Sequence, residues 1–234
     1  MNMKCVLIVG GSCDIGLVLS KYFKKLGYNV VVGYNNDSNR YIDDIEYVKC
    51  DITNPGNIDG VINDIKNKYG NIDILINLSC VCMDNSFLNK TKDEFMRVLE
   101  VNLVGTFLLN QIYSRYIDNG FIINMGSTDG IDTYNEYNID YSVSKNGIVF
   151  LSKIIAGYTS NRVLCLCPNW IDTKSTRSMN KEFLDSELKR IGQERLISLY
   201  ELESAFDKII NSEFNSGDSY RIDIKGSKLW IEKM

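Results

Sequence analysis

The chain has 234 residues, of which 44% are hydrophobic and 24% charged, and its formal net charge is −4. These values exclude a largely disordered chain and leave no basic stripe for a phosphate backbone, so no nucleic-acid partner is expected. The length fits one α/β domain over residues 1–234 with no linker.

Two residue counts restrict the chemistry: the chain has no histidine and seven cysteines. Without histidine, Ser-His-Asp and Cys-His catalysis are excluded, and any proton transfer must use Tyr, Lys, Asp, Glu or Cys. An odd cysteine number indicates reduced thiols rather than a disulfide framework. The first apolar run, Cys5–Val9, is too short for a signal peptide, and no segment has the length of a membrane span. We therefore expect a cytoplasmic protein without a membrane partner.

Along the chain, short apolar runs rich in β-formers alternate with amphipathic segments of helical length, which is the pattern of βαβ units. The predicted strands are Cys5–Val9, Asn29–Tyr34, Glu46–Cys50, Ile72–Asn77, Phe121–Met125, Arg162–Cys167 and Tyr220–Ile224. The predicted helices are Asp14–Leu26, Ile58–Tyr69, Lys92–Tyr116, Tyr141–Tyr158 and Leu199–Ile210. This order predicts a single-domain Rossmann fold, a doubly wound seven-stranded parallel sheet with helices on both faces. The helix Lys92–Tyr116 is apolar on more than one face, which favours a homo-dimer or homo-tetramer.

The first predicted strand ends in a glycine-rich turn, residues 10–16, that leads into a helix. Glycine allows a close approach to a pyrophosphate, and the helix start supplies free N–H groups. A glycine-rich turn without a ligand is the alternative. The second strand has no acid at its tip, where a carboxylate would hold the ribose hydroxyls of NAD. Ser12 and Asn35, with Arg40 nearby, are instead candidates for a 2′-phosphate, so NADP(H) is favoured over NAD(H).

A second group of polar residues has catalytic character. Tyr141 and Lys145 are four residues apart, which places both on one face of a helix. With 14 tyrosines in the chain, about one such pair is expected by chance, so the argument depends on its neighbours. Ser127 follows a predicted buried strand, at the end where ligands bind in open α/β sheets, and Asn102 lies in a strongly apolar helix.

These motifs have the order and spacing of the short-chain dehydrogenases/reductases, and the chain resembles the classical type of that family over nearly its whole length. Among the subgroups of that family, the sequence as a whole most resembles the 3-oxoacyl-[acyl-carrier-protein] reductases. The resemblance implies a catalytic tetrad of Asn102, Ser127, Tyr141 and Lys145. Tyr141 would protonate the carbonyl oxygen as hydride arrives from the nicotinamide, and Ser127 would polarise that carbonyl. Lys145 would bind the nicotinamide ribose and lower the tyrosine pKa, and Asn102 would support a water relay.

The resemblance also implies cofactor contacts from the glycine turn, from the strand ends that follow it, from the catalytic pair and from the segment after the sixth strand. These residues are Gly10, Ser12, Asp14, Ile15, Gly16, Asn35, Asp51, Ile52, Asn77, Tyr141, Lys145, Pro168, Ile171 and Thr173. Four positions depart from the family pattern: Val9, Asp14, Leu78 with the two residues after it, and Asn169. Asp14 would repel phosphates if its side chain faced them, and Asn169 replaces a glycine but enters left-handed conformations readily.

Two cysteine pairs, Cys80 with Cys82 and Cys165 with Cys167, could suggest a soft-metal site, but buried free cysteines are common small hydrophobes and no metal is expected. Residues 174–198 are polar with a helical patch and resemble the family's substrate loop. The expected function is an NAD(P)-dependent oxidoreductase that reduces a carbonyl by hydride transfer, or oxidises the corresponding alcohol. Acyl thioester (including 3-oxoacyl), sugar, steroid-like and simple ketone substrates remain open. The alternative is a catalytically impaired NAD(P)-binding sensor or scaffold.

Overall fold

The computed structural model describes residues 3–36 and 42–234. Its strands are β1 (Cys5–Val9), β2 (Asn29–Tyr34), β3 (Glu46–Lys49), β4 (Ile74–Asn77), β5 (Phe121–Met125), β6 (Arg162–Pro168), β7 (Ser219–Lys225) and β8 (Lys228–Lys233). Its helices are α1 (Asp14–Lys25), α2 (Pro55–Tyr69), α3 (Lys92–Leu99), α4 (Gly105–Tyr116), α5 (Ile139–Ile155), α6 (Lys174–Arg177), α7 (Lys181–Ile191) and α8 (Leu199–Ile210). Every strand and helix predicted from the sequence is present, with ends that differ by a few residues.

The strands form one sheet in the order β3-β2-β1-β4-β5-β6-β7-β8, parallel except for the last pair. The order reverses between β1 and β4, because the chain first builds outward through β2 and β3 and then returns to the other side of β1. Such a switch point leaves a crevice outside the carboxyl ends of the strands, where open α/β sheets bind ligands. The Rossmann fold expected from the sequence is therefore confirmed.

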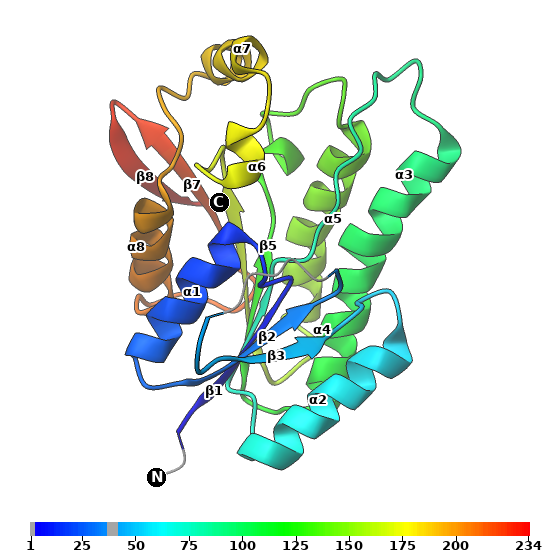
Figure 1. Cartoon of the computed structure of the whole chain (residues 1–234), viewed down its shortest axis with the longest axis vertical. Helices are drawn as coiled ribbons and strands as arrows, with labels where there is room; N and C mark the ends of the chain where they lie inside the picture. The colour runs from blue at the N-terminus through cyan, green and yellow to red at the C-terminus, as the bar shows by residue number, and fades with distance from the viewer. Residues whose placement is uncertain (1–2, 37–41) are drawn as a thin grey trace.

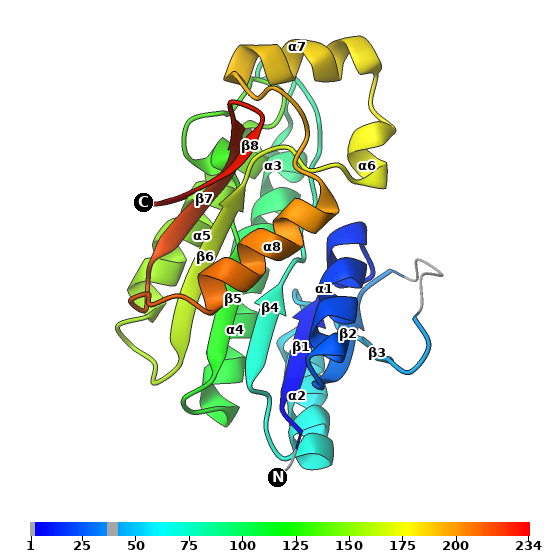
Figure 2. The same ribbon diagram turned by 90° about the vertical axis from the view of Figure 1, so that its left-hand side faces the viewer.

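Helices cover both faces of the sheet because the strands are apolar on both faces. In β1, Cys5, Leu7 and Val9 pack in the layer formed with α2 and α4, whereas Val6 and Ile8 pack in the layer formed with α1 and α8. Figure 2 shows α1 and α8 in front of the sheet, with α2 and α4 behind it. The period-2 alternation of strand side chains thus builds two separate cores.

The sheet has eight strands rather than the expected seven. Gly226 (φ +56) and Ser227 (φ +59) form a two-residue turn, after which β8 pairs antiparallel with β7. Two successive left-handed residues match the twist of a hairpin. Only Leu229 and Ile231 of β8 pack against the core, so the apolar alternation that announces a strand is short here, and the sequence analysis missed it.

The predicted helix Lys92–Tyr116 is divided. A π-helical turn, η1 (Glu100–Val104), separates α3 from α4, and it contains Asn102. A capping box of Thr91 and Glu94 starts α3. A π-turn adds one residue to a turn of the helix and is frequent at functional sites. The added residue shifts the apolar side chains after it around the helix axis, so the segment, predicted as one helix, is apolar on more than one face.

Residues 174–198 contain the helices α6 and α7, and α7 lies where the sequence indicates a helical patch. Figure 1 shows both helices above the carboxyl ends of β6 and β7, at the end of the molecule opposite α2. The segment therefore covers the crevice side of the sheet. Within residues 3–36 and 42–234, no helix has both the length and the apolar character required to span a bilayer.

Candidate active site

The turn between β1 and α1 has a backbone that only glycine fits at two positions. Gly10 has φ +73, and a Cβ there would lie 2.6 Å from the backbone nitrogen of Ser79. A Cβ on Gly16 would lie 2.1 Å from the carbonyl oxygen of Gly11. The thiol of Cys13 caps the helix by accepting from the N–H of Gly16 at 3.4 Å. The positive end of α1 therefore meets the carboxyl end of β1 without side chains between them, which fits the pyrophosphate of a dinucleotide.

The side chain of Asp14 is directed toward α6. Its Oδ2 accepts a hydrogen bond from the backbone N–H of Lys174, the first residue of α6, at 2.6 Å. Its neighbours in the turn, Ser12 and Ile15, are half-buried. The acid that departs from the family pattern therefore links the glycine turn to the segment after β6.

The residues expected near the adenosine half of the cofactor lie after β2 and β3. Asn35 is exposed, and Arg40 lies outside the described residues. Asp51 accepts hydrogen bonds from the hydroxyl (2.7 Å) and the N–H (2.9 Å) of Thr53, and these bonds lower the pKa of Asp51. Ile52 is buried in the core layer of α2 and α4. Asp51 thus stabilises its own turn, and this role needs no ligand.

Asn77 ends β4 beside the glycine turn and is buried. Its Nδ2 donates to the hydroxyl of Thr106 at 2.9 Å, and its Oδ1 accepts from the N–H of Ser79 at 3.1 Å. Asn77 therefore holds the loop after β4 against α4, and that loop is the one that Gly10 approaches.

Tyr141 and Lys145 lie on α5 next to the end of β5. The Lys145 Nζ is 5.3 Å from the centroid of the Tyr141 ring and donates to the carbonyl oxygen of Met125 at 2.7 Å. Lys145 is buried. The carbonyl at the end of β5 thus fixes the ammonium group beside the phenol ring.

The pKa of the Tyr141 phenol is raised well above its ordinary value, first because the phenol is withdrawn from solvent and next because Cys80 and Asp129 lie nearby. A hydrogen bond with Ser127 acts in the opposite direction. The Ser127 hydroxyl also accepts from the N–H of Asp129 at 3.1 Å, which holds it at the end of β5. The phenol is therefore a proton donor at neutral pH.

Asn102 connects the loop after β4 to α5. Its Oδ1 accepts from the N–H of Val81 (2.8 Å), and its Nδ2 donates to the Val81 carbonyl (2.9 Å) and to the Ser144 hydroxyl (3.0 Å). Its own carbonyl accepts from the Thr106 hydroxyl at 2.5 Å. The side chain is thus used in bracing the loop against the helix that carries Tyr141.

The segment after β6 departs from the expected turn. Asn169 follows Pro168, the last residue of β6, and does not adopt a left-handed conformation. Its Nδ2 donates to Oδ1 of Asp223 at 3.2 Å, and its Oδ1 accepts from the N–H of Trp170 at 3.0 Å. Side-chain hydrogen bonds therefore make the bend that a glycine would make through its backbone.

Ile171 and Thr173 then lead into α6. Ile171 forms a parallel bridge with Ile197, near the far end of residues 174–198. Thr173 caps α6 by accepting from the N–H of Thr176 at 3.2 Å. These contacts place both residues between β6 and α6, on the crevice side of the sheet.

Cys165 and Cys167 lie on β6, buried, with their Sγ atoms 3.8 Å apart. They pack under Gly126, where a Cβ would lie 2.6 Å from the Cys167 Sγ. Cys80 and Cys82 are exposed on the loop after β4. In the described part of the chain, no group of three or more His, Cys, Asp or Glu is arranged to hold a metal ion.

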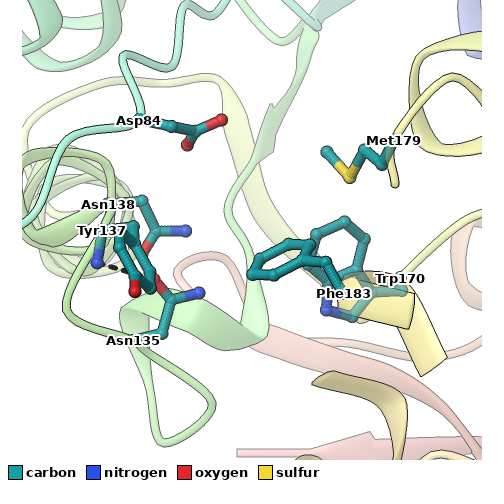
Figure 3. Close-up of a pocket in the computed structure, with 7 residues that line it drawn as sticks. All are labelled: Asp84, Asn135, Tyr137, Asn138, Trp170, Met179 and Phe183. Carbon is teal, nitrogen blue, oxygen red and sulfur yellow. Dashed lines mark hydrogen bonds between the residues drawn. The ribbon is translucent and has the colours of Figure 1, made fainter. Parts of the chain in front are cut away.

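A cavity of about 290 Å³ opens between α7, the segment before α5 and the loop after β4. Three aromatic rings, two amides, a carboxylate and a thioether line it, as Figure 3 shows: Tyr137, Trp170, Phe183, Asn135, Asn138, Asp84 and Met179. Asn138 is one helical turn before Tyr141 and donates to Asp129 at 3.1 Å, which ties this wall to the start of α5. The sequence analysis did not identify these residues. Trp170 stands two residues after Pro168, which was the available signal.

The sequence analysis also missed a buried ion pair. Lys90 Nζ lies 3.0 Å from Oδ2 of Asp140, and both side chains are almost fully buried. Lys90 also donates to the Met83 carbonyl, and Oδ1 of Asp140 accepts from the N–H of Tyr141 at 2.9 Å. The pair therefore connects the loop after β4 to the residue that precedes the tyrosine.

Comparison with known proteins gives consistent results. The 3-oxoacyl-[acyl-carrier-protein] reductase of Vibrio cholerae is 27% identical over 219 residues, covering 88% of this chain and 89% of the relative. Carbonyl reductase family member 4 of Xenopus laevis is 28% identical over 219 residues, covering 87% and 92%. The crystal structure of a short chain dehydrogenase from Leptospira borgpetersenii with bound NAD+ matches with a TM-score of 0.82 at 27% identity, covering 95% of this chain and 92% of that one.

A family model described as short chain dehydrogenase matches residues 4–183, well over half of the chain. That span runs from β1 into α7 and includes the glycine turn, Ser127 and the Tyr141–Lys145 pair. The chain therefore belongs to the short-chain dehydrogenase family, in its classical form, and is an NAD(P)-dependent oxidoreductase.

Proposed function

We propose that this protein is a carbonyl reductase in which Tyr141 is the acid-base group. The main support is the Tyr141 phenol itself, which is protonated at neutral pH, hydrogen-bonded with Ser127 and close to the Lys145 ammonium. These groups lie at the carboxyl end of β5, where open α/β sheets bind ligands. A bound nicotinamide supplies the hydride to the carbonyl carbon.

In the reductive direction, the Tyr141 hydroxyl gives its proton to the carbonyl oxygen, which becomes the hydroxyl of the alcohol. The tyrosinate that remains is stabilised by Lys145 until it regains a proton from solvent. Ser127 donates to the carbonyl oxygen and orients it. Lys145 also binds the nicotinamide ribose, and Asn102 contributes by keeping the loop after β4 in place against α5.

Replacing Tyr141 by Phe tests this mechanism, because it removes the hydroxyl and keeps the ring. We expect kcat to fall by about 10²–10⁴-fold, the usual contribution of a positioned acid, with an unchanged Kd for the reduced cofactor. Steady-state oxidation of NADPH and fluorescence titration measure these two quantities. Turnover that survives the substitution would remove Tyr141 from the mechanism.

For the cofactor, we propose NADP(H) over NAD(H). The end of β2 carries no acid through Asn36, and Ser12 and Asn35 are the polar candidates for contacts with a 2′-phosphate. The dissociation constants of NADPH and NADH for the wild-type protein decide the question, and tighter binding of NADH would overturn the preference.

Because several relatives are 3-oxoacyl-[acyl-carrier-protein] reductases, a 3-oxoacyl thioester is a candidate substrate. All seven cysteines are free, which favours a reducing compartment such as the cytoplasm. The second candidate function is a cofactor-binding sensor or scaffold, and the link from Asp14 to Lys174 at the phosphate turn is the observation in its favour. Tight NADPH binding without oxidation by any ketone in a broad panel would support the sensor.

A further inference from the structure

The cavity beside the catalytic tyrosine is small and aromatic. In Figure 3, Trp170 and Phe183 lie on one side of it and Tyr137 on the other, and the Tyr137 and Phe183 rings are 6.4 Å apart in an edge-to-face arrangement. A volume of about 290 Å³ is at the lower end for ligand pockets. The cavity therefore suits one substituted ring packed against aromatic side chains better than a long chain.

The two amides of the cavity are held in fixed orientations. Asn135 donates to Oε2 of Glu187 at 3.3 Å and accepts from the N–H of Tyr137 at 2.9 Å. Asn138 donates to Asp129 and accepts from the Ser142 hydroxyl at 3.3 Å. Both amides are thus already bonded to the protein through their oxygen and one N–H.

Asp84 differs from these amides because its charge is not neutralised. Its only protein partner in the described part of the chain is the thiol of Cys82, at 3.3 Å from Oδ1. Lys90, which donates to the carbonyl of the preceding residue Met83, is already paired with Asp140 at 3.0 Å, and Arg190 is paired with Glu187 at 2.8 Å. The carboxylate of Asp84 is therefore the acidic group in the cavity lining that no cation of the described residues pairs with.

We propose that Asp84 is a specificity-determining residue, and that the substrate is a ring-bearing, non-anionic carbonyl compound that presents hydroxyl or ammonium donors to Asp84. The inference rests on the proposed reductase function and names its substrate class. An open carboxylate accepts hydrogen bonds and attracts cations, and it repels a substrate carboxylate or phosphate. The rings of Trp170 and Phe183 bind the apolar faces of a sugar-like or amino-substituted ring.

Ligand binding can be measured without turnover, because Trp170 is one of only two tryptophans. In the variant Trp230→Phe, quenching of Trp170 reports occupancy of the cavity. The probes are four alcohols of one shape: cyclohexanol, cyclohexane-1,4-diol, 4-aminocyclohexanol and 4-hydroxycyclohexanecarboxylate. We expect the diol and the amine to bind about tenfold more tightly than cyclohexanol, and the carboxylate about tenfold more weakly. If the amine binds more tightly than the diol, the natural substrate is cationic. If the amine and the diol bind equally tightly, the natural substrate is hydroxylated.

Asp84→Asn keeps the size of the side chain and removes its charge. In that variant the difference between the amine and the carboxylate should shrink to about threefold or less. Asp64→Asn is the matched control, because Asp64 is an exposed carboxylate on α2, at the opposite end of the molecule. This variant should bind the four alcohols in the same order of affinity as the parent protein. A carboxylate that binds as tightly as the diol, or an order that persists in Asp84→Asn, overturns the proposal.

The matching ketones separate this inference from the reductase proposal. If the alcohols bind in the expected order but none of the four ketones oxidises NADPH or NADH, the reductase proposal fails and the recognition by Asp84 stands. If the ketones are reduced with equal kcat/KM irrespective of charge, the reductase stands and the role of Asp84 is disproved.

Discussion

Tyr141 carries its proton at neutral pH because its burial and its acidic neighbours raise its pKa. In the proposed mechanism, reduction uses the phenol as a donor and needs the protonated form, whereas oxidation of an alcohol needs the tyrosinate. The direction of the shift therefore extends the pH range in which reduction is possible toward alkaline values and restricts oxidation to high pH.

We expect kcat/KM for ketone reduction to be flat between about pH 6 and 8 and to fall only at higher pH, as Tyr141 loses its proton. In Lys145→Met the phenol loses a neighbouring cation, so its pKa rises further and this alkaline limb should move to higher pH, with a reduced kcat. Profiles of kcat/KM against pH for both proteins measure the shift. A limb that stays in place in Lys145→Met would show that another group titrates.

Asp14 allows a second test of a single residue. We expect Asp14→Asn to bind NADPH several-fold more tightly than wild type, because it removes a negative charge from the turn that receives the phosphates. The amide oxygen can still accept from the Lys174 N–H, so the contact that Asp14 makes at 2.6 Å is retained. Asp14→Gly removes both the charge and the hydrogen bond from Lys174. Comparing the two variants therefore separates the effect of the charge from that of the hydrogen bond. The gain should diminish at high salt, and weaker binding by Asp14→Asn would contradict the charge argument.

At the scale of elements, polar contacts hold the loop after β4 in place, among them those from Asn77 to the backbone of Ser79, from Asn102 to the backbone of Val81, and from Lys90 to Asp140. Two of these contacts tie the loop to η1 and α5, which carry proposed site residues. The loop also carries Asp84 and the exposed Cys80 and Cys82. One wall of the site therefore depends on buried polar groups, which cost stability when a partner is removed.

The Lys90–Asp140 pair makes this measurable. Lys90→Met should lower the free energy of unfolding by about 3–5 kcal/mol, because it leaves the Asp140 carboxylate buried without a cation. The double variant Lys90→Met/Asp140→Leu should recover most of that loss, since it buries no unpaired charge. Urea unfolding of wild type, both single variants and the double variant gives the coupling. A double variant no more stable than the singles would show that the pair does more than satisfy its own charges.

Much of the fold was predictable from the sequence, because short local patterns of residues specify its strands and turns. Each parallel strand is a short apolar run, such as Phe121–Met125, and Gly10 and Gly16 mark the turn because no other residue fits their surroundings. The positions of the proposed tetrad came instead from the resemblance to the short-chain dehydrogenases, because the spacing of Tyr141 and Lys145 alone is expected about once by chance. The π-turn at Asn102 and the hairpin to β8 were not predictable, because neither leaves a distinct apolar pattern. The Lys90–Asp140 pair joins residues 50 positions apart, so only the folded chain brings them together.

At the scale of the whole molecule, one outer face has more apolar surface than a solvated helix layer requires. On α5, Val143, Phe150 and Ile154 are exposed along one stripe, and Phe107 on α4 and Met96 on α3 are exposed as well. Helices α3 and α5 are in contact with each other, so the stripes adjoin. Contiguous apolar patches on a folded domain mark interaction surfaces, and a second copy of the chain is the partner favoured by the apolar character of these helices.

We therefore expect a homo-dimer or homo-tetramer at micromolar concentration, with Phe150 buried between copies. Phe150→Glu should lower the molecular mass in sedimentation equilibrium to that of a smaller assembly, because it places a charge in an apolar contact. Tyr200→Glu is the control: Tyr200 is 78% exposed on α8, on the opposite face of the sheet, and its substitution should leave the mass unchanged. If wild type sediments as a monomer of 26.7 kDa, the exposed stripe belongs to another partner, and the site on the crevice side is complete within one chain.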